Sequence, residues 1–181
     1  MKFSKQKNRG FTLVETLVAV SIFSLSVLAL MAVLSQGISD TEYAKKKIIG
    51  TFLAQEGIEF LRNMRDNHIL YSQSTSNNWT QFKARLAPCN VGSECGFNTA
   101  LSTTDPNFVF TCTSNPENCK VYISNGVYNT NLVGTDSGFT RKISATTVSA
   151  NELKVISTVS WMQRSGLYSM SFSDDLFNWT E

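Results

Sequence analysis

The chain contains one long uncharged apolar segment close to its N-terminus. From Thr16 to Leu34 no residue is charged, and Glu15 stands directly before this segment. At about 1.5 Å per residue, a helix over this segment just crosses a hydrocarbon core of about 30 Å. The segment therefore predicts a membrane-spanning helix with an acidic side chain at its edge.

Charge divides the chain near the same place. The first ten residues hold four basic side chains and no acidic one. Taking these from the 16 basic residues leaves 12 against 14 acidic residues, a net charge of about −2 for the rest. This balance does not indicate a nucleic-acid-binding surface. The basic start predicts a cytoplasmic N-terminus and an extracytoplasmic C-terminal domain.

Two ordinary targeting signals explain this segment only in part. A cleaved secretory signal has an apolar region of about 7 to 15 residues, followed by a site of small residues. Here the apolar run is longer, and only Leu30 and Ala32 offer a weak match to such a site. An uncleaved signal anchor stays open, but it gives no reason for Glu15.

The stretch KNRGFTLVE, residues 7–15, resembles the class III leader of type IV pilins and type II secretion pseudopilins. The resemblance implies that a prepilin peptidase removes residues 1–10 by cutting between Gly10 and Phe11, and that the new Phe11 amine is then methylated. It also implies that an inner-membrane assembly platform packs the chain with other pilin subunits into a helical filament on the cell surface. Residues 11–34 would form the membrane and filament-core half of its helix.

The same resemblance implies a subunit-assembly role for Glu15. An ionised carboxylate near hydrocarbon costs on the order of 2 to 3 kcal/mol, so it needs a partner. In the family, the glutamate at this place is thought to pair with the N-terminal amine of a neighbouring subunit, which here is Phe11. Gly10 has no Cβ, so the peptide before the cleaved bond can lie close to a protease backbone.

Residues 35–67 are expected to continue the helix as an amphipathic half. Their apolar residues recur at three- and four-residue spacing, which places them on one face. They are Ile49, Phe52, Leu53, Phe60, Leu61 and Met64. A glycine within a helix destabilises it by about 1 kcal/mol relative to alanine. We therefore expect the helix to be locally less stable at Gly37, Gly50 and Gly57.

The absence of proline from residues 11–87 bears on the kind of subunit. Many major pilins have a proline in the apolar half of this helix, so the pattern favours a minor pilin or a pseudopilin. Residues 54–67 and the C-terminal strands are similar to those of PilV-like minor pilins.

Residues 68–119 are expected to form an irregular loop region, with a short helix near residues 79–86. His68 is expected to be a solvated residue at the end of the long helix. All four cysteines, Cys89, Cys95, Cys112 and Cys119, fall in this region. An even number outside the cytoplasm predicts disulfides, which allow three connectivities.

The local pairs Cys89 with Cys95 and Cys112 with Cys119 are the preferred connectivity, because each closes a small loop that contains glycine or proline. Free thiols stay open as an alternative to disulfides. A zinc site is disfavoured because the C-x5-C and C-x6-C spacings differ from the usual C-x2–4-C. We therefore expect no metal.

Residues 120–181 are expected to form an antiparallel sheet. Asn125 and Gly126, with β-formers on both sides, predict a hairpin. Alternating apolar residues follow in 139–146, 153–161 and 167–172. The apolar stripe of the long helix can cover one face of this sheet. The expected fold class is α+β and pilin-like, with a loop-rich insert that bears disulfides.

No motif indicates an enzyme or a cofactor. The sequence has no phosphate-binding glycine loop, and a Ser-His-Asp site would have to use His68, the single histidine. The expected function is a filament subunit, with a type II secretion pseudopilin as the nearest alternative. A membrane-anchored extracytoplasmic binding domain is the alternative from another class.

Overall fold

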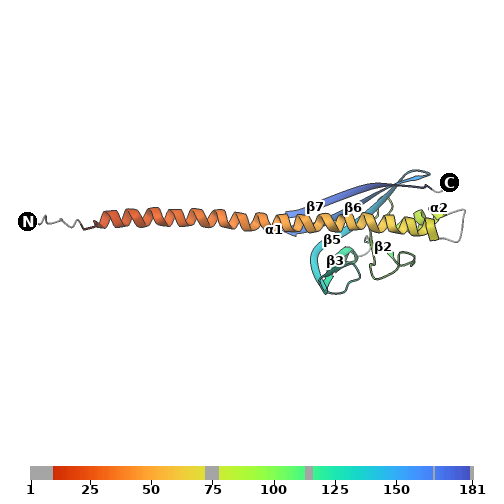
Figure 1. Ribbon diagram of the computed structural model, residues 1–181, viewed down its shortest axis with the longest axis horizontal. Coiled ribbons are helices and arrows are strands. Elements are labelled where there is room, and N and C mark those ends of the chain that lie inside the picture. Colours follow the sequence, from red (N-terminus) through yellow and green to blue (C-terminus); the bar gives the residue numbers. More distant parts are fainter. Residues whose placement is uncertain (1–9, 72–77, 113–115, 165, 180–181) are drawn as a thin grey trace, which may run out of the picture. The chain divides into compact units, whose positions relative to one another are not determined.

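A single long helix, α1, runs from Leu13 to Tyr71 (Figure 1). The computed structural model describes residues 10–71, 78–112, 116–164 and 166–179, so residues 1–9 of the expected leader lie outside the described residues. The chain divides into two units, Met1–Ala44 and Lys45–Glu181, and α1 contributes residues to both. The second unit holds the sheet and the hydrophobic core.

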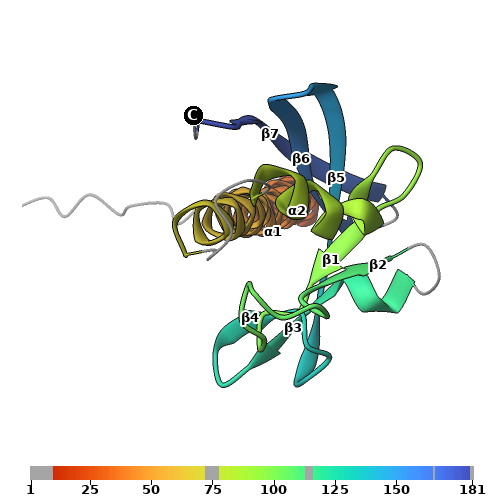
Figure 2. The ribbon, with the colours of Figure 1, turned by 90° about the vertical axis from the view of Figure 1, so that its right-hand side faces the viewer.

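The second unit contains a seven-stranded antiparallel sheet, counted over the described residues. The strands are β1 (Cys95–Phe97), β2 (Val109–Thr111), β3 (Lys120–Ser124), β4 (Val127–Asn129), β5 (Thr135–Ser149), β6 (Glu152–Gln163) and β7 (Gly166–Phe177). β6 pairs along one edge of β5, and β7 pairs with β6. The other edge of β5 is shared, because β3 pairs with its first residues and β1 pairs at Ile143. β4 and β2 extend these two branches, as Figure 2 shows.

The predicted hairpin is confirmed, and so is the strand alternation in β5 and β6, whereas residues 167–169 of β7 are all exposed. In β5 the buried residues are Phe139, Arg141, Ile143 and Ala145, and in β6 they are Leu153, Val155, Ser157, Val159, Trp161 and Gln163. Asn125 and Gly126 connect β3 to β4 with φ angles of 51° and 78°. Positive φ at both central residues of a two-residue turn is the geometry that an Asn-Gly pair favours.

The second half of α1 packs its apolar face on the sheet, so the α+β expectation is confirmed. Leu53, Ala54, Ile58, Leu61 and Met64 are buried along this face. The core also receives residues from α2 (Asn78–Arg85), which forms where a short helix was expected. Two short 3-10 helices, η1 (Ala87–Cys89) and η2 (Pro116–Cys119), connect the remaining elements.

The expected boundaries of the irregular region differ from the structure. α1 ends at Tyr71 rather than near residue 67, and residues 68–119 also contribute β1 and β2. Each of these strands has only three residues, which is too short for an alternating pattern to be visible in the sequence. They form because β1 pairs with β5 at Ile143, a contact between distant parts of the chain.

Gly50 and Gly57 lie where the helix contacts the sheet closely, and are not the places of lower helix stability that were expected. A Cβ on Gly50 would lie 2.9 Å from Cζ3 of Trp161, and one on Gly57 would lie 2.4 Å from Oγ of Ser157. The absence of a side chain therefore lets α1 approach β6 closely at both places. Nothing lies within 4 Å of the corresponding position at Gly37.

Candidate functional site in the N-terminal segment

Thr12 caps the start of α1. The backbone N–H of Glu15 donates a hydrogen bond to Oγ1 of Thr12 at 3.3 Å, and helix α1 begins at Leu13. A threonine followed three residues later by glutamate is the sequence signature of a capping box. This signal is visible in the sequence, although it is not among the predictions made from it.

The cap leaves the bond between Gly10 and Phe11 outside the helix. Both residues are exposed, with Phe11 79% exposed, and no side chain lies within 4 Å of where a Cβ on Gly10 would stand. Glu15 lies in the first turn, where the helix dipole favours a negative charge. No cation of the described residues forms an ion pair with its carboxylate.

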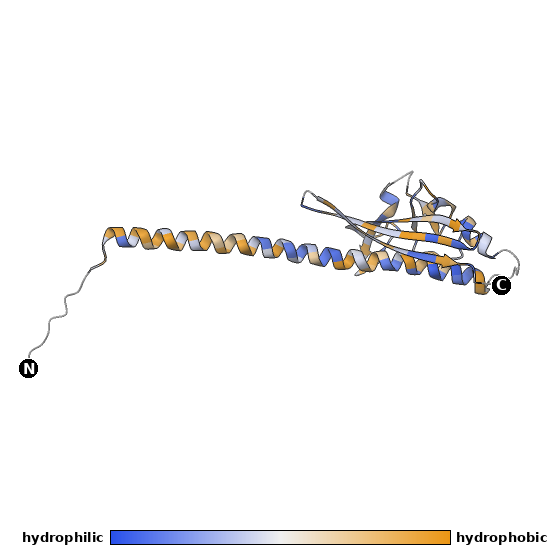
Figure 3. Cartoon of the chain, turned by 90° about the horizontal axis from the view of Figure 1, so that it is seen from above, coloured by the Kyte–Doolittle hydropathy of each residue, from blue (hydrophilic) through white to orange (hydrophobic). Residues whose placement is uncertain are grey.

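The first part of α1 is an uncovered apolar surface. Its large apolar side chains between Leu13 and Leu34 are 49% to 80% exposed, except that of Val27, which is partly buried. Figure 3 shows that apolar residues dominate this part of the helix. In the described part of the chain, α1 is one helix that is long and apolar enough to span a membrane. An apolar surface of this extent needs a lipid or protein cover.

Three serines lie within this apolar segment, and each is already satisfied by its own helix. The hydroxyl groups of Ser21, Ser24 and Ser26 each donate a 2.8 Å hydrogen bond to the carbonyl oxygen four residues earlier. Because these donors are paired internally, they carry little cost in an apolar environment. The segment from Thr16 to Leu34 is therefore suited to burial over its whole length.

The four cysteines form two disulfides in the second unit. Cys89 pairs with Cys95 and Cys112 pairs with Cys119, with Cα–Cα distances of 4.8 and 5.7 Å. These are the local pairs that the sequence favoured, and the structure leaves no cysteine free. The first bond links η1 to β1, and the second links Cys112, the residue directly after β2, to η2. The described residues hold no cluster of metal-ligating side chains.

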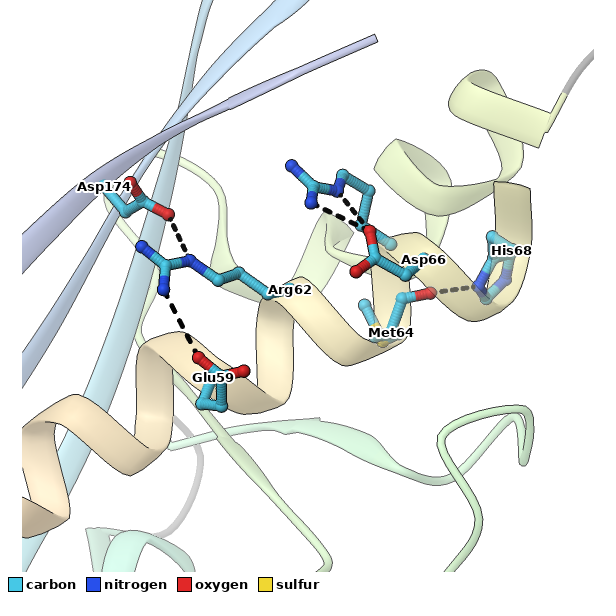
Figure 4. A network of polar contacts seen from close by, with 7 residues as sticks. Glu59, Arg62, Met64, Asp66, His68 and Asp174 are labelled. Atoms are coloured by element: carbon cyan, nitrogen blue, oxygen red, sulfur yellow. Dashed lines mark hydrogen bonds and ion pairs between the residues drawn. The ribbon is translucent and has the colours of Figure 1, made fainter. Parts of the chain in front are cut away.

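His68 lies inside the helix and is buried, so the expectation of a solvated helix-end histidine is wrong. Its Nδ1 donates to the backbone carbonyl of Met64 at 2.9 Å, as drawn in Figure 4. Its ring packs 6.2 Å from that of Phe82, centroid to centroid. The burial follows from the extension of α1 to Tyr71 and from α2, which packs back on this last turn.

Charged groups reinforce the contact between α1 and the sheet. Nε of Arg62 lies 2.9 Å from Oδ2 of Asp174 in β7, and its Nη1 lies 3.3 Å from Oε2 of Glu59 (Figure 4). Burial lowers the pKa of Arg141 in β5, and the neighbouring Glu56 opposes that shift. These pairs fix the helix on the sheet, and none of them borders the N-terminal segment.

Comparison with known proteins bears on the N-terminal segment alone. Residues 5–33 match the model of the prokaryotic N-terminal methylation motif. The comparisons found no curated protein and no solved structure that matches the chain. The similarity to PilV-like minor pilins therefore stays a prediction from the sequence.

Proposed function

We propose that this chain is the precursor of a minor pilin, a structural subunit of a type IV pilus or a related filament. The methylation motif and the apolar helix support a pilin-type or pseudopilin precursor. One observation carries the proposal: the uncovered apolar part of α1, which begins at Leu13, holds Glu15 in its first turn, and the Glu15 carboxylate forms no ion pair among the described residues. A filament core of packed helices supplies both the apolar cover and a cationic partner.

In this proposal a prepilin peptidase cuts between Gly10 and Phe11. The cut creates a positive amine on Phe11, four residues before Glu15, and this amine is then methylated. The Glu15 carboxylate of one subunit pairs with the Phe11 amine of the next. Pairing neutralises both charges inside the apolar core and sets the axial position of each subunit.

Before assembly, the subunit is anchored in the cytoplasmic membrane by residues 11–34, with its second unit outside the cytoplasm. The inner-membrane assembly platform then transfers it to the filament. Disulfides are stable in oxidising compartments, so the two bonds in the second unit agree with this location. The role is structural and uses no cofactor.

The first test is the N-terminal sequence and intact mass of the protein in filaments sheared from native cells. We expect a chain that begins with methylated Phe11 in this fraction. Its abundance relative to other subunits separates a minor from a major pilin. A chain that keeps Met1 and occurs only in the membrane would contradict processing and assembly together.

The charge-pairing step is tested with Glu15→Ala. We expect normal membrane levels of the variant and loss of the subunit from sheared filaments. Glu42→Ala is a matched control, because Glu42 is an exposed acid on the same helix. Filaments that incorporate Glu15→Ala as well as the control would refute the pairing step.

Two alternatives predict different results in the same experiments. A type II secretion pseudopilin would be processed in the same way, but its loss would abolish secretion rather than surface filaments. A membrane-anchored binding domain predicts that Glu15→Ala changes neither the abundance nor the location of the protein.

A further inference from the structure

A small cavity in the second unit lies far in sequence from the N-terminal segment. It has a volume of about 180 Å³ and is lined by Asn98, Phe110, Asn118, Thr130, Asn131 and Leu132. These residues come from the end of β1, from β2, from η2 and from the β4–β5 loop. Three side-chain amides, one hydroxyl group and one aromatic ring thus meet at one place, and no lining side chain is charged.

The amide of Asn131 is not satisfied by the protein. Its Oδ1 atom is buried, and no described residue donates a hydrogen bond to it. A buried acceptor without a donor carries a desolvation cost, which a donor on a ligand would remove. Asn131 lines the cavity, so a rotation of its amide would bring this acceptor to a ligand hydroxyl or N–H group.

The loop that holds Asn131 has a strained backbone. Leu132, the next residue, has a φ of 61°. A positive φ is uncommon for residues other than glycine, asparagine and aspartate. Gly134 adopts its φ of 107° without strain because it has no Cβ, and a Cβ there would lie 2.2 Å from the carbonyl oxygen of Ile123. Strain of this kind persists where surrounding contacts enforce it, and it gathers at ligand sites.

Fixed contacts hold the walls of the cavity in place. The backbone N–H of Thr130 donates to Oγ1 of Thr99 at 3.3 Å, and its hydroxyl group donates to the carbonyl of Phe97. On the other wall, Phe110 and Asn118 stand close in sequence to Cys112 and Cys119, which are joined by a disulfide. The backbone of the cavity walls is therefore held in place, which lowers the entropy cost of binding.

We propose that this cavity binds one residue of a neutral carbohydrate. Amide side chains can both donate to and accept from sugar hydroxyl groups. The half-buried ring of Phe110, which packs on Gly96, adds an apolar surface for the C–H groups of a sugar ring. The volume lies below the roughly 300 Å³ at which pockets for drug-sized ligands begin, so it suits a single small ring. The uncharged lining favours neutral over acidic sugars.

The inference does not depend on filament assembly, and it is tested with the full chain in a zwitterionic detergent that contains no sugar. The probes are the methyl glycosides of glucose, galactose and N-acetylglucosamine, followed by saturation-transfer NMR. We expect wild-type protein to bind at least one probe, with glucuronic acid no better than the neutral sugars. Absence of saturation transfer to every neutral probe would overturn the proposal, as would binding of glucuronic acid alone.

Variants locate the binding to this cavity. Asn131→Leu and Asn118→Leu keep the side-chain size but remove the amide, and we expect each to raise the Kd roughly tenfold or more. Asn90→Leu is the matched control, because Asn90 is exposed in another loop, and its Kd should not change. If Asn131→Leu does not fold, Asn118→Leu decides. Equal affinity in Asn118→Leu and the control would overturn the site.

If a sugar binds, it can come from the producing cells or from other cells. Binding measurements with glycans from each source separate these two cases. Neutral polysaccharide extracted from the producing cells would indicate attachment to their own envelope. Preferential binding of neutral glycans from other cells would indicate recognition of a foreign surface. Either preference upholds the carbohydrate site, provided that Asn118→Leu weakens it.

Discussion

The guanidinium group of Arg141 on β5 donates a hydrogen bond of 2.6 Å to the carboxylate of Glu56 on α1. The Arg141 side chain is 3% exposed, whereas that of Glu56 is 42% exposed. Arg141 also donates to the backbone carbonyl of Leu53 at 3.3 Å, and its Cζ lies 5.6 Å from the ring centroid of Phe60. The arginine thus joins the centre of the sheet to two successive turns of the helix.

Removing the acidic partner should destabilise the second unit. Glu56→Ala leaves a buried cation without its carboxylate, which should lower the free energy of unfolding by about 1 to 3 kcal/mol. Arg141→Met removes the cation itself and should cost less. Urea unfolding of the full chain in detergent measures both.

Glu59→Ala is the control, because Glu59 is 70% exposed and its pair with Arg62 should contribute less than about 1 kcal/mol. Equal losses for Glu56→Ala and Glu59→Ala would contradict this account.

Gly57 should not tolerate a side chain. In Gly57→Ala the new Cβ would stand 2.4 Å from Oγ of Ser157 and 3.0 Å from Cδ1 of Ile143. Overpacking costs about 1 to 3 kcal/mol, which exceeds the gain of about 1 kcal/mol in helix propensity. We expect a lower midpoint of urea unfolding and partial rescue when Ser157→Gly is added. Gly37→Ala has open space around it and should not lower the midpoint. A midpoint unchanged in Gly57→Ala would show that α1 does not approach β6 this closely.

Asp136 should make stability depend on pH in the acid range. The backbone N–H of Gly138 donates to its Oδ1 at 2.7 Å, and this hydrogen bond, with help from Lys120, lowers the pKa of Asp136. A lowered pKa in the folded state stabilises the protein fully above the unfolded-state pKa of about 4. That contribution is lost as the pH falls through the lower folded-state pKa. We expect the stability difference between wild type and Asp136→Asn to shrink between about pH 6 and about pH 3. A difference that stays constant over this range in urea unfolding would argue against the shift.

Much of the fold could be predicted because its periodic patterns are long. Along β5 and β6, apolar and polar residues alternate over a long stretch of each strand, and the Asn125–Gly126 turn has a strong local signature. The burial of His68 and the close contact of Gly57 could not be predicted, since both depend on elements distant in sequence. β1 and β2 were missed for the same reason. In the candidate site, Gly10, Phe11 and Glu15 were identified through a resemblance, whereas Thr12 had its own local signal.

Thr12 should set where the helix begins. Thr12→Val keeps the shape of the side chain but removes the oxygen that accepts from the Glu15 N–H, a loss of about 1 kcal/mol at a helix start. That cost corresponds to roughly fivefold faster hydrogen exchange at the Glu15 amide. The measurement is amide exchange by NMR on the labelled full chain in detergent micelles. Thr16→Val is the matched control, because the Thr16 hydroxyl donates to the carbonyl of Leu13 and supports no amide. If Glu15 exchanges at the same rate in both variants, Thr12 is not the cap, and the bond between Gly10 and Phe11 is kept outside the helix by something else.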